Sequence, residues 1–262
     1  MISIGMTKTI RMRMMSMKTN ERFLESLKYM DAEMRKDKSA GKPWRYTNVK
    51  KRYSRFEDAR KHNRLTNCVS GVQMGLLMAG LPSACTHWYG AGGKIVFTSN
   101  EGREAVKKHF DVKTVNATVN SLYKDNKLCD GDILIYQNMN HTNCYYGGAK
   151  SFDSGHAYCK GNGELAVFNK WIGNLAVKTA KVGCILRLKD RAHYRVQAGA
   201  FSDINKYNEH VEMMRKKGFA TSMLIEDGLY KVQAGSFSGR TNAEKLVSLL
   251  AKKSIPSFIK EV

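Results

Sequence analysis

The sequence has little proline, few acidic residues and no long apolar run, and each shortage excludes a class of protein. Only 3 of the 262 residues are proline and 42% are hydrophobic, which excludes a disordered chain and indicates a globular one. No apolar stretch approaches the roughly 20 residues that a membrane-spanning helix needs. The start of the chain is basic and rich in methionine, but it lacks the apolar core and cleavage site of a signal peptide. We therefore expect synthesis in the cytoplasm, with residues 1–17 as a candidate disordered leader.

The shortage of acidic residues makes the chain strongly basic. Lys and Arg number 44 against 23 Asp and Glu, a formal net charge of +21. From Asp190 to the end there are 12 basic and 8 acidic residues, a net of +4, so most of the excess lies in the first two thirds. A charge of this size predicts attraction to polyanions, namely nucleic acid, anionic lipid or an anionic cell wall.

The cysteines form no recognisable pattern. None of the six belongs to a CxxC motif or is spaced with histidines as zinc ligands are. The sequence therefore predicts no metal site, no cofactor and no disulfide framework. Five of the six are expected to be small buried hydrophobes, namely Cys85, Cys129, Cys144, Cys159 and Cys184.

Helical patterns dominate the first part of the chain. Apolar residues at helical spacing predict a helix over residues 18–37, and a second helix begins at Cys68 and ends at the stop signals Gly80 and Pro82. The basic stretch between them, residues 50–64, is expected to be a solvated face or loop, or else a contact with an anionic wall polymer. A strand over residues 95–98 and a helix over residues 100–109 follow.

Strand patterns follow from Asp130 onward. Strands are expected over residues 131–136, 141–146, 150–153 and 182–188, with a glycine turn between the second and third. Helices first and an antiparallel sheet afterwards indicate an α+β domain over residues 1–189.

An internal repeat marks a second domain over residues 190–262. The segment YRVQAGAFS at residues 194–202 returns 36 residues later as YKVQAGSFS, with seven of nine positions identical. A helical pattern and a short strand follow each copy. This order predicts a βαββαβ domain, with one sheet and two helices on one face.

Cys68 is the candidate nucleophile, because the start of a helix stabilises a thiolate and presents free backbone N–H groups. His141, about seventy residues later and entering a strand, is the candidate base; a helix-borne thiol and a sheet-borne imidazole form a papain-like layout. A three-residue turn that pairs Tyr145 with Ala149 puts His141 opposite Asp153, which would orient the imidazole. A two-residue turn would instead put Asp153 opposite Thr142. His156 is the alternative orienting residue.

Three segments carry a family resemblance over roughly residues 40–188. The segments NCVSGVQ from Asn67, DGDILIY from Asp130 and HTNCYYG from His141 resemble the nucleophile, Gly-Asp and histidine segments of NlpC-type cell-wall cysteine peptidases, as found in phage endolysins of Gram-positive hosts. The resemblance implies a papain-like fold and the roles of Cys68 as nucleophile, His141 as base and Asp153 as third polar residue. The family often has histidine, asparagine or glutamine at that third position. An upstream aromatic residue lines the family's site, and here Trp44 or Tyr46 is the candidate.

The repeated tail resembles a SPOR domain over residues 192–262. That resemblance implies binding to peptidoglycan glycan strands stripped of their peptides, on the sheet face away from the helices. Strand alternation independently places Val196, Ala198, Val232 and Ala234 under the helices. The opposite face then carries the candidate glycan-binding residues Arg195, Gln197, Lys231 and Gln233. The family often has an aromatic residue where this chain has Leu229.

The sequence thus predicts an endolysin-type hydrolase that cleaves an amide in the peptide part of peptidoglycan. Its expected partners are peptidoglycan and anionic wall polymers. The bond between muramic acid and L-alanine is an alternative target, which would make the enzyme an amidase. A second alternative is RNA binding, since βαββαβ is also the topology of RNA-recognition modules. A third is a catalytically inactive wall-binding protein in which Cys68 is merely buried.

Overall fold

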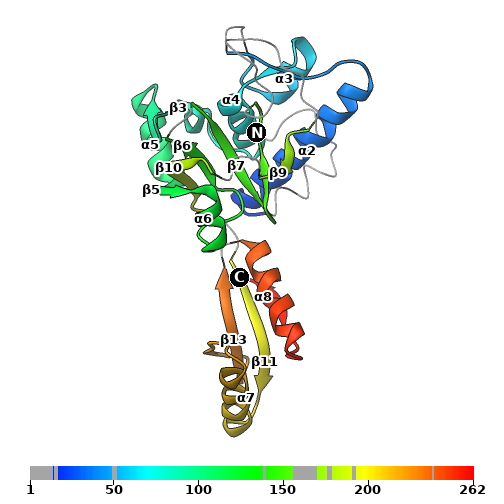
Figure 1. Cartoon of the computed structure of the whole chain (residues 1–262), viewed down its shortest axis with the longest axis vertical. Coiled ribbons are helices and arrows are strands. Elements are labelled where there is room, and N and C mark those ends of the chain that lie inside the picture. Colours follow the sequence, from blue (N-terminus) through cyan, green and yellow to red (C-terminus); the bar gives the residue numbers. More distant parts are fainter. Residues whose placement is uncertain are drawn as a thin grey trace. The chain divides into compact units, whose positions relative to one another are not determined.

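The computed structural model describes residues 14, 17–48, 52–137, 140–155, 170–175, 179–190, 193–237 and 239–262. The chain divides into two compact units, Met1–Arg191 and Ala192–Val262. Each unit combines helices with antiparallel strands, which confirms the α+β class (Figure 1). Within the described ranges, no helix is both long enough and apolar enough to cross a membrane.

The N-terminal unit is built on an antiparallel six-stranded sheet in the order β5-β10-β6-β7-β8-β9. Its strands are β5 (Phe110–Thr118), β6 (Ile133–Tyr136), β7 (Thr142–Gly147), β8 (Lys150–Phe152), β9 (Ile172–Asn174) and β10 (Lys181–Leu188). Successive side chains of β6 point to opposite faces of the sheet and pack into two different apolar clusters. Ile133 and Ile135 pack with the larger apolar cluster, whereas Leu134 and Tyr136 pack with the smaller one.

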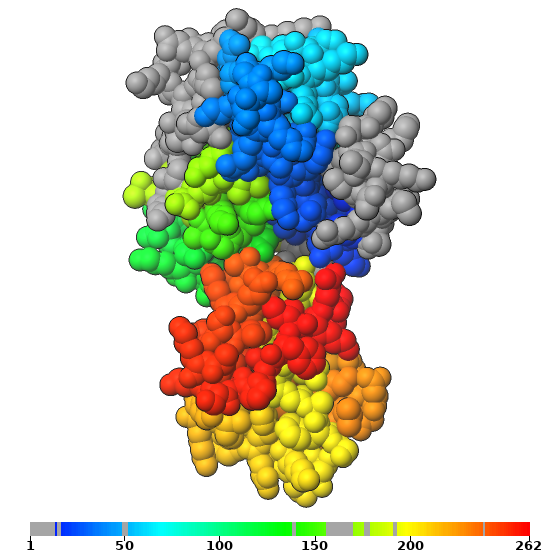
Figure 2. All heavy atoms as spheres, turned by 90° about the vertical axis from the view of Figure 1, so that its right-hand side faces the viewer, coloured from blue at the N-terminus to red at the C-terminus, as the bar shows by residue number. Residues whose placement is uncertain are grey.

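Helices cover both faces of this sheet. The larger core contains apolar residues of α2 (Thr19–Ser39) and α4 (Cys68–Met78), and the smaller core those of α6 (Val119–Lys124). Helix α2 packs against α4 and also lies beside β9, where the Asp31 carboxylate accepts from the backbone N–H groups of Trp171 and Ile172. Figure 2 shows this neighbourhood from outside, with blue α2 beside the yellow-green segment. The unit is completed by α3 (Phe56–His62), α5 (Asn100–His109), the 3-10 turn η1 (Ser83–Thr86), and the strand pairs β1 (Arg45–Tyr46) with β2 (Leu65–Thr66) and β3 (Trp88–Ala91) with β4 (Lys94–Phe97).

Residues 50–64, expected to form a solvated face or a loop, contain the helix α3 in their second half, with Asp58, Lys61 and His62 exposed. Phe56 is buried there and stacks on Trp44, with ring centroids 5.0 Å apart. Two basic side chains of this segment, Arg60 and Arg64, hydrogen-bond to Asp37, whereas Arg55 and Lys61 are exposed. Burial of Phe56 and neutralisation by Asp37 explain why a strongly basic stretch forms part of the core.

The C-terminal unit has the predicted βαββαβ order. Its elements are β11 (Tyr194–Phe201), α7 (Ile204–Lys216), β12 (Ser222–Glu226), β13 (Leu229–Phe237), α8 (Arg240–Lys252) and β14 (Phe258–Glu261). They form one antiparallel sheet in the order β12-β13-β11-β14, with α7 and α8 against β11 and β13. The β12–β13 hairpin turns at Asp227-Gly228, and both residues have positive φ, of 56° and 71°. Asp-Gly is favoured at such a turn because its two central residues must adopt the left-handed region.

Candidate functional site

The N-terminus of helix α4 is fixed by a reciprocal cap. The Asn67 side chain accepts from the backbone N–H of Ser70 at 2.8 Å, and the Ser70 hydroxyl accepts from the backbone N–H of Asn67 at 2.7 Å. Cys68 is the first residue of the helix and is 6% exposed. The backbone N–H groups of the first turn have no partner within the helix, and they carry its positive end. The thiol therefore lies where a negative charge is stabilised.

The expected base and orienting residue are in contact. His141 Nε2 and Asp153 Oδ2 are 3.0 Å apart, and both side chains are buried. The predicted register is nevertheless wrong, since Tyr145 pairs with Ser151 rather than with Ala149. Gly147 pairs with Lys150 next to the turn, and the irregularity between Tyr145 and Gly147 shifts the pairing by one residue, so the partner of Tyr145 lies two residues beyond the expected one. His141 therefore meets Asp153 as a diagonal neighbour on the same face, a distance that long side chains span.

Cys68 and His141 are also brought together. Burial lowers the pKa of His141, but hydrogen bonds to Asp153 and Cys68, with the charges of both partners, outweigh it and raise the pKa to about 9. Because Nε2 is engaged by Asp153, the other ring nitrogen is the one available to the thiol. The three side chains form a chain of contacts from helix α4 to the end of β8. His156 lies outside the described residues.

Two residues that the sequence analysis did not identify extend this chain of contacts. Asn143 Nδ2 lies 3.4 Å from Asp153 Oδ2, and the Tyr136 hydroxyl donates to Asn143 Oδ1 at 3.0 Å. The Tyr136 ring also stacks on His141, with centroids 5.5 Å apart. Burial raises the pKa of Tyr136, which keeps its hydroxyl protonated as a donor. Strand alternation could have identified Asn143 from the sequence, because Asn143 lies two residues after His141 and therefore on the same face of the sheet.

The structure distinguishes the two candidate aromatic residues. Trp44 is completely buried, and its Nε1 donates to Asp37 at 3.0 Å. The Tyr46 hydroxyl instead donates to Asn48 Oδ1 at 3.2 Å, the same oxygen that Asn67 approaches to 3.4 Å. Tyr46 therefore lies beside the residue that precedes Cys68, and Trp44 belongs to the core.

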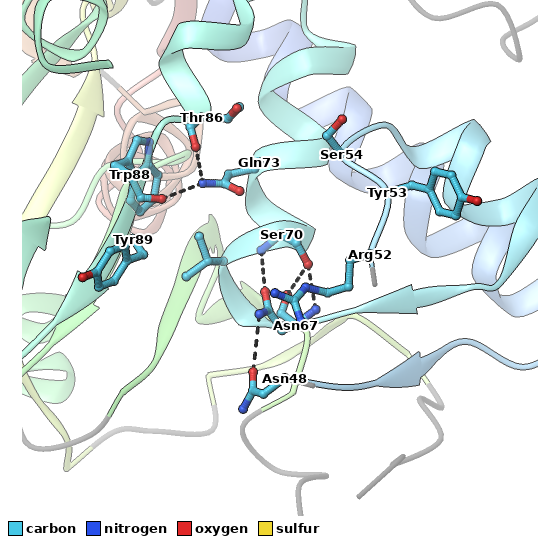
Figure 3. Close-up of a pocket in the computed structure, with 11 residues that line it drawn as sticks. Asn48, Arg52, Tyr53, Ser54, Asn67, Ser70, Gln73, Thr86, Trp88 and Tyr89 are labelled. Atoms are coloured by element: carbon cyan, nitrogen blue, oxygen red, sulfur yellow. Dashed lines mark hydrogen bonds between the residues drawn. The ribbon is translucent and has the colours of Figure 1, made fainter. Parts of the chain in front are cut away.

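A cleft of about 540 Å³ opens next to the start of helix α4. Asn67, Val69 and Ser70, which flank Cys68, line one side of it (Figure 3). Gln73 ties the opposite wall to the helix, since its amide donates to the carbonyls of Thr86 and Trp88. Tyr89 is about half exposed at this wall, and Arg52 is the one charged side chain among the described residues that line the cleft. Its volume is in the range of small-molecule sites, and the described residues that line it include neighbours of Cys68 but not Cys68 itself.

The other described cysteines are Cys85, Cys129, Cys144 and Cys184. All are buried, and burial raises the pKa of Cys85 and of Cys184 to about 11. Cys159 lies outside the described residues. Across the described ranges, no group of three or more His, Cys, Asp and Glu residues is arranged to hold a metal ion.

The C-terminal unit has one covered and one open sheet face. Val196, Ala198, Val232 and Ala234 pack under the helices with Tyr194 and Tyr230, so these tyrosines are not free to stack on bases. The four predicted glycan-binding residues alternate with the covered ones and belong to the open face. Their charged members are already engaged. Glu226 lies 2.9 Å from Arg195, 3.1 Å from Lys231 and 2.7 Å from Lys260, and hydrogen bonds from Lys260, Lys231 and Arg195 lower its pKa to about 2.

The neutral part of the open face forms a continuous row across all four strands. Ser222 pairs with Gln233, Gln233 with Gln197, and Gln197 with Phe258. Phe258 is 53% exposed, and its neighbour Ile259 packs in the helix-side core, so the Phe258 ring belongs to the open face. The SPOR family often has an aromatic residue where this chain has Leu229. Among the described residues of this face, the exposed aromatic residue is Phe258 of the last strand.

Comparisons with known proteins identify the C-terminal unit. Residues 190–261 match the family model of the SPOR domain. The solution structure of the peptidoglycan binding domain of the B. subtilis cell wall lytic enzyme CwlC is similar, with 30% sequence identity and a TM-score of 0.27 over 29% of this chain and 96% of that one. A search of curated proteins returned no match. The C-terminal part of this chain, residues 190–261, is therefore a member of the SPOR domain family.

Proposed function

We propose that this protein hydrolyses an amide bond in the peptide part of peptidoglycan, and that its SPOR domain holds it on the glycan. The observation that carries the proposal is the contact chain Cys68–His141–Asp153, at the start of a helix and beside a cleft. A thiol, a base and a group that orients the base are the parts of a nucleophilic acyl-transfer site. The resemblance to NlpC-type peptidases supports the same roles, with aspartate as the third polar residue.

The reaction begins with the Cys68 thiolate and a protonated His141. The sulfur attacks the amide carbon, and the oxyanion that forms is held by backbone N–H groups at the start of α4. When the C–N bond breaks, His141 gives its proton to the departing amine nitrogen. His141 then takes a proton from water, and the resulting hydroxide attacks the thioester carbon, which releases the acid and restores the Cys68 thiolate and the protonated His141. Asp153 keeps the imidazole oriented throughout and stabilises its charged form.

The SPOR domain supports the choice of substrate. Peptidoglycan is the ligand of this domain family, and the open sheet face of residues 194–261 offers amide groups and an aromatic ring for sugar hydroxyls and ring faces. The basic N-terminal two thirds add attraction to anionic wall polymers. We place the site of action at the bacterial cell wall and the bond cleaved in the peptide, either within the stem or at its link to muramic acid.

The test measures loss of turbidity of purified Gram-positive cell walls by the wild type, Cys68→Ala and Cys85→Ala. Cys85→Ala is the matched control, because it removes a buried thiol outside the site. We expect the wild type and Cys85→Ala to lyse walls, and Cys68→Ala to lose roughly a thousandfold or more of the rate. Cys68→Ala should still sediment with walls, which separates binding from hydrolysis.

Full lysis by folded Cys68→Ala would contradict the proposed mechanism. Mass spectrometry of the released fragments then identifies the bond. A new N-terminal amine within the stem indicates an endopeptidase, and an intact stem that begins with L-alanine indicates an amidase.

A further inference from the structure

A second cleft, of about 470 Å³, lies in the N-terminal unit on the other side of the β3–β4 hairpin. It shares no lining residue with the cleft beside Cys68. Trp88 of β3 lines the first cleft, and its partner across the hairpin, Phe97 of β4, lines the second. Helix α5 and the strands β5 and β10 supply the remaining walls. The proposed hydrolysis assigns no role to this cleft.

The inner surface of the second cleft is apolar. Its lining includes Ile95 and Phe97 of the hairpin, Val106 of α5, and Val112 and Val115 of β5. Val106 is completely buried at the base, whereas Val112 is 48% exposed at the edge. The apolar wall thus runs from the buried Val106 to the half-exposed Val112. An aliphatic chain that packed on it would remove this apolar surface from water.

The charged residues that line this cleft all have the same sign. They are Lys94, Arg103 and Lys107, and the described residues that line the cleft include no carboxylate. Lys107 is paired with Glu104 at 2.8 Å, but no ion pair within the described ranges engages Lys94 or Arg103. The Arg103 guanidinium lies 5.4 Å from the centroid of the Phe97 ring, so it is held at the boundary between the apolar surface and water. An anionic group on a ligand would pair with the cationic side chains Arg103 and Lys94 at this boundary.

We propose that this cleft binds an anionic amphiphile, which is a single aliphatic chain that ends in a phosphate or carboxylate. The chain would lie along Ile95, Phe97 and Val112, and the head group would meet Arg103 and Lys94. A bare anion would leave the apolar part of this lining uncovered. The volume is in the range of small-molecule sites.

Isothermal titration of the full chain tests the inference with decyl phosphate, 1-decanol and inorganic phosphate, all below any micelle concentration. We expect decyl phosphate to saturate a single site and the other two probes to bind at least about tenfold more weakly, since each lacks one of the two contacts. Arg103→Gln should weaken decyl phosphate about tenfold, because it removes a charged partner of the head group. Val112→Asp should abolish binding, because it places a carboxylate on the apolar surface.

Arg215→Gln on α7 is the matched control, since Arg215 is exposed and lies outside the cleft. It should leave the affinity unchanged. Lys94→Gln replaces Arg103→Gln if the latter is unstable. Equal affinity for decanol and decyl phosphate, binding of phosphate alone, or the same loss in Arg215→Gln and Arg103→Gln would overturn the proposal. None of these three outcomes depends on wall lysis.

Discussion

The two units hold their candidate sites in opposite ways. In the N-terminal unit, Cys68 and His141 are 6% and 5% exposed, and each polar group of the site contacts the next. In the SPOR unit, the residues of the open face are spread over four strands and Phe258 is half exposed. Interactions between buried charges are strong and coupled, whereas those at an open surface are screened by water. Substitutions should therefore abolish function in the first unit and reduce it by degrees in the second.

The largest difference should come from His141→Gln. Glutamine keeps much of the side-chain volume but neither takes nor gives a proton, so wall lysis should fall roughly a thousandfold. The rate at which iodoacetamide alkylates Cys68 at neutral pH should fall as well, because the imidazolium that stabilises the thiolate is gone. His62→Gln, at an exposed position on α3, should leave both rates unchanged. If His141→Gln and His62→Gln lowered the rates of lysis and alkylation equally, the loss would reflect a general effect on the protein and not the coupling of His141 to Cys68.

The same coupling should appear in the pH dependence of stability. The folded pKa of His141, about 9, lies above its ordinary value of 6.5, so the protonated form is stabilised by folding. This stabilisation is complete below about pH 6.5 and is lost as the pH rises through 9. The difference in unfolding free energy between the wild type and His141→Gln should therefore shrink by up to about 3 kcal/mol between pH 6 and pH 10. Urea unfolding at the two pH values measures it, and a difference independent of pH would contradict the coupling.

A smaller effect should distinguish positioning from packing within the buried site. Tyr136→Phe removes the hydroxyl that donates to Asn143, which in turn contacts Asp153. We expect a loss of about 1 kcal/mol of stability and a several-fold fall in the rate of lysis with a displaced pH profile. Tyr145→Phe is the control, since this buried tyrosine hydrogen-bonds to the Ala149 backbone instead. Tyr145→Phe should lose a similar amount of stability but keep the pH profile of lysis of the wild type. If Tyr136→Phe kept that profile as well, the role of Tyr136 would be packing alone.

The SPOR unit was the more predictable of the two from sequence. Its repeat and its strand alternation are local signals, and together they predicted the order of elements and the covered face. The engagement of Arg195 and Lys231 with Glu226 was not predictable. It depends on three strands that meet in space, and alternation reports only which face a side chain occupies.

In the N-terminal unit, local patterns predicted helices α2, α4 and α5 and most of the central strands, but not how they meet. The strand β5 was missed because its solvent-facing residues give no apolar run, and helix α3 was missed because charges flank a single buried Phe56. The contact of His141 with Asp153 was predicted from a wrong register. A bulge near Tyr145 shifted the pairing, and the side chains were long enough to meet diagonally. A register is set by the turn, and the turn has positive φ at Gly147, Gly148 and Ala149, which sequence counting did not anticipate.

The smallest effect should come from the open face of the SPOR unit. Phe258→Ala removes the one exposed aromatic ring at the end of the neutral row, next to Gln197. Stacking of an aromatic ring contributes about 1 kcal/mol, so the affinity for isolated peptidoglycan should fall several-fold and not vanish. Leu249→Ala is closely matched, since Leu249 is also 53% exposed but lies on α8, and α8 packs on the covered face. Sedimentation with walls, with Cys68→Ala as the background so that no substrate is consumed, compares the two. A graded loss confined to Phe258→Ala supports an open binding face that tolerates single losses, whereas equal retention by both variants would place the glycan elsewhere on the domain.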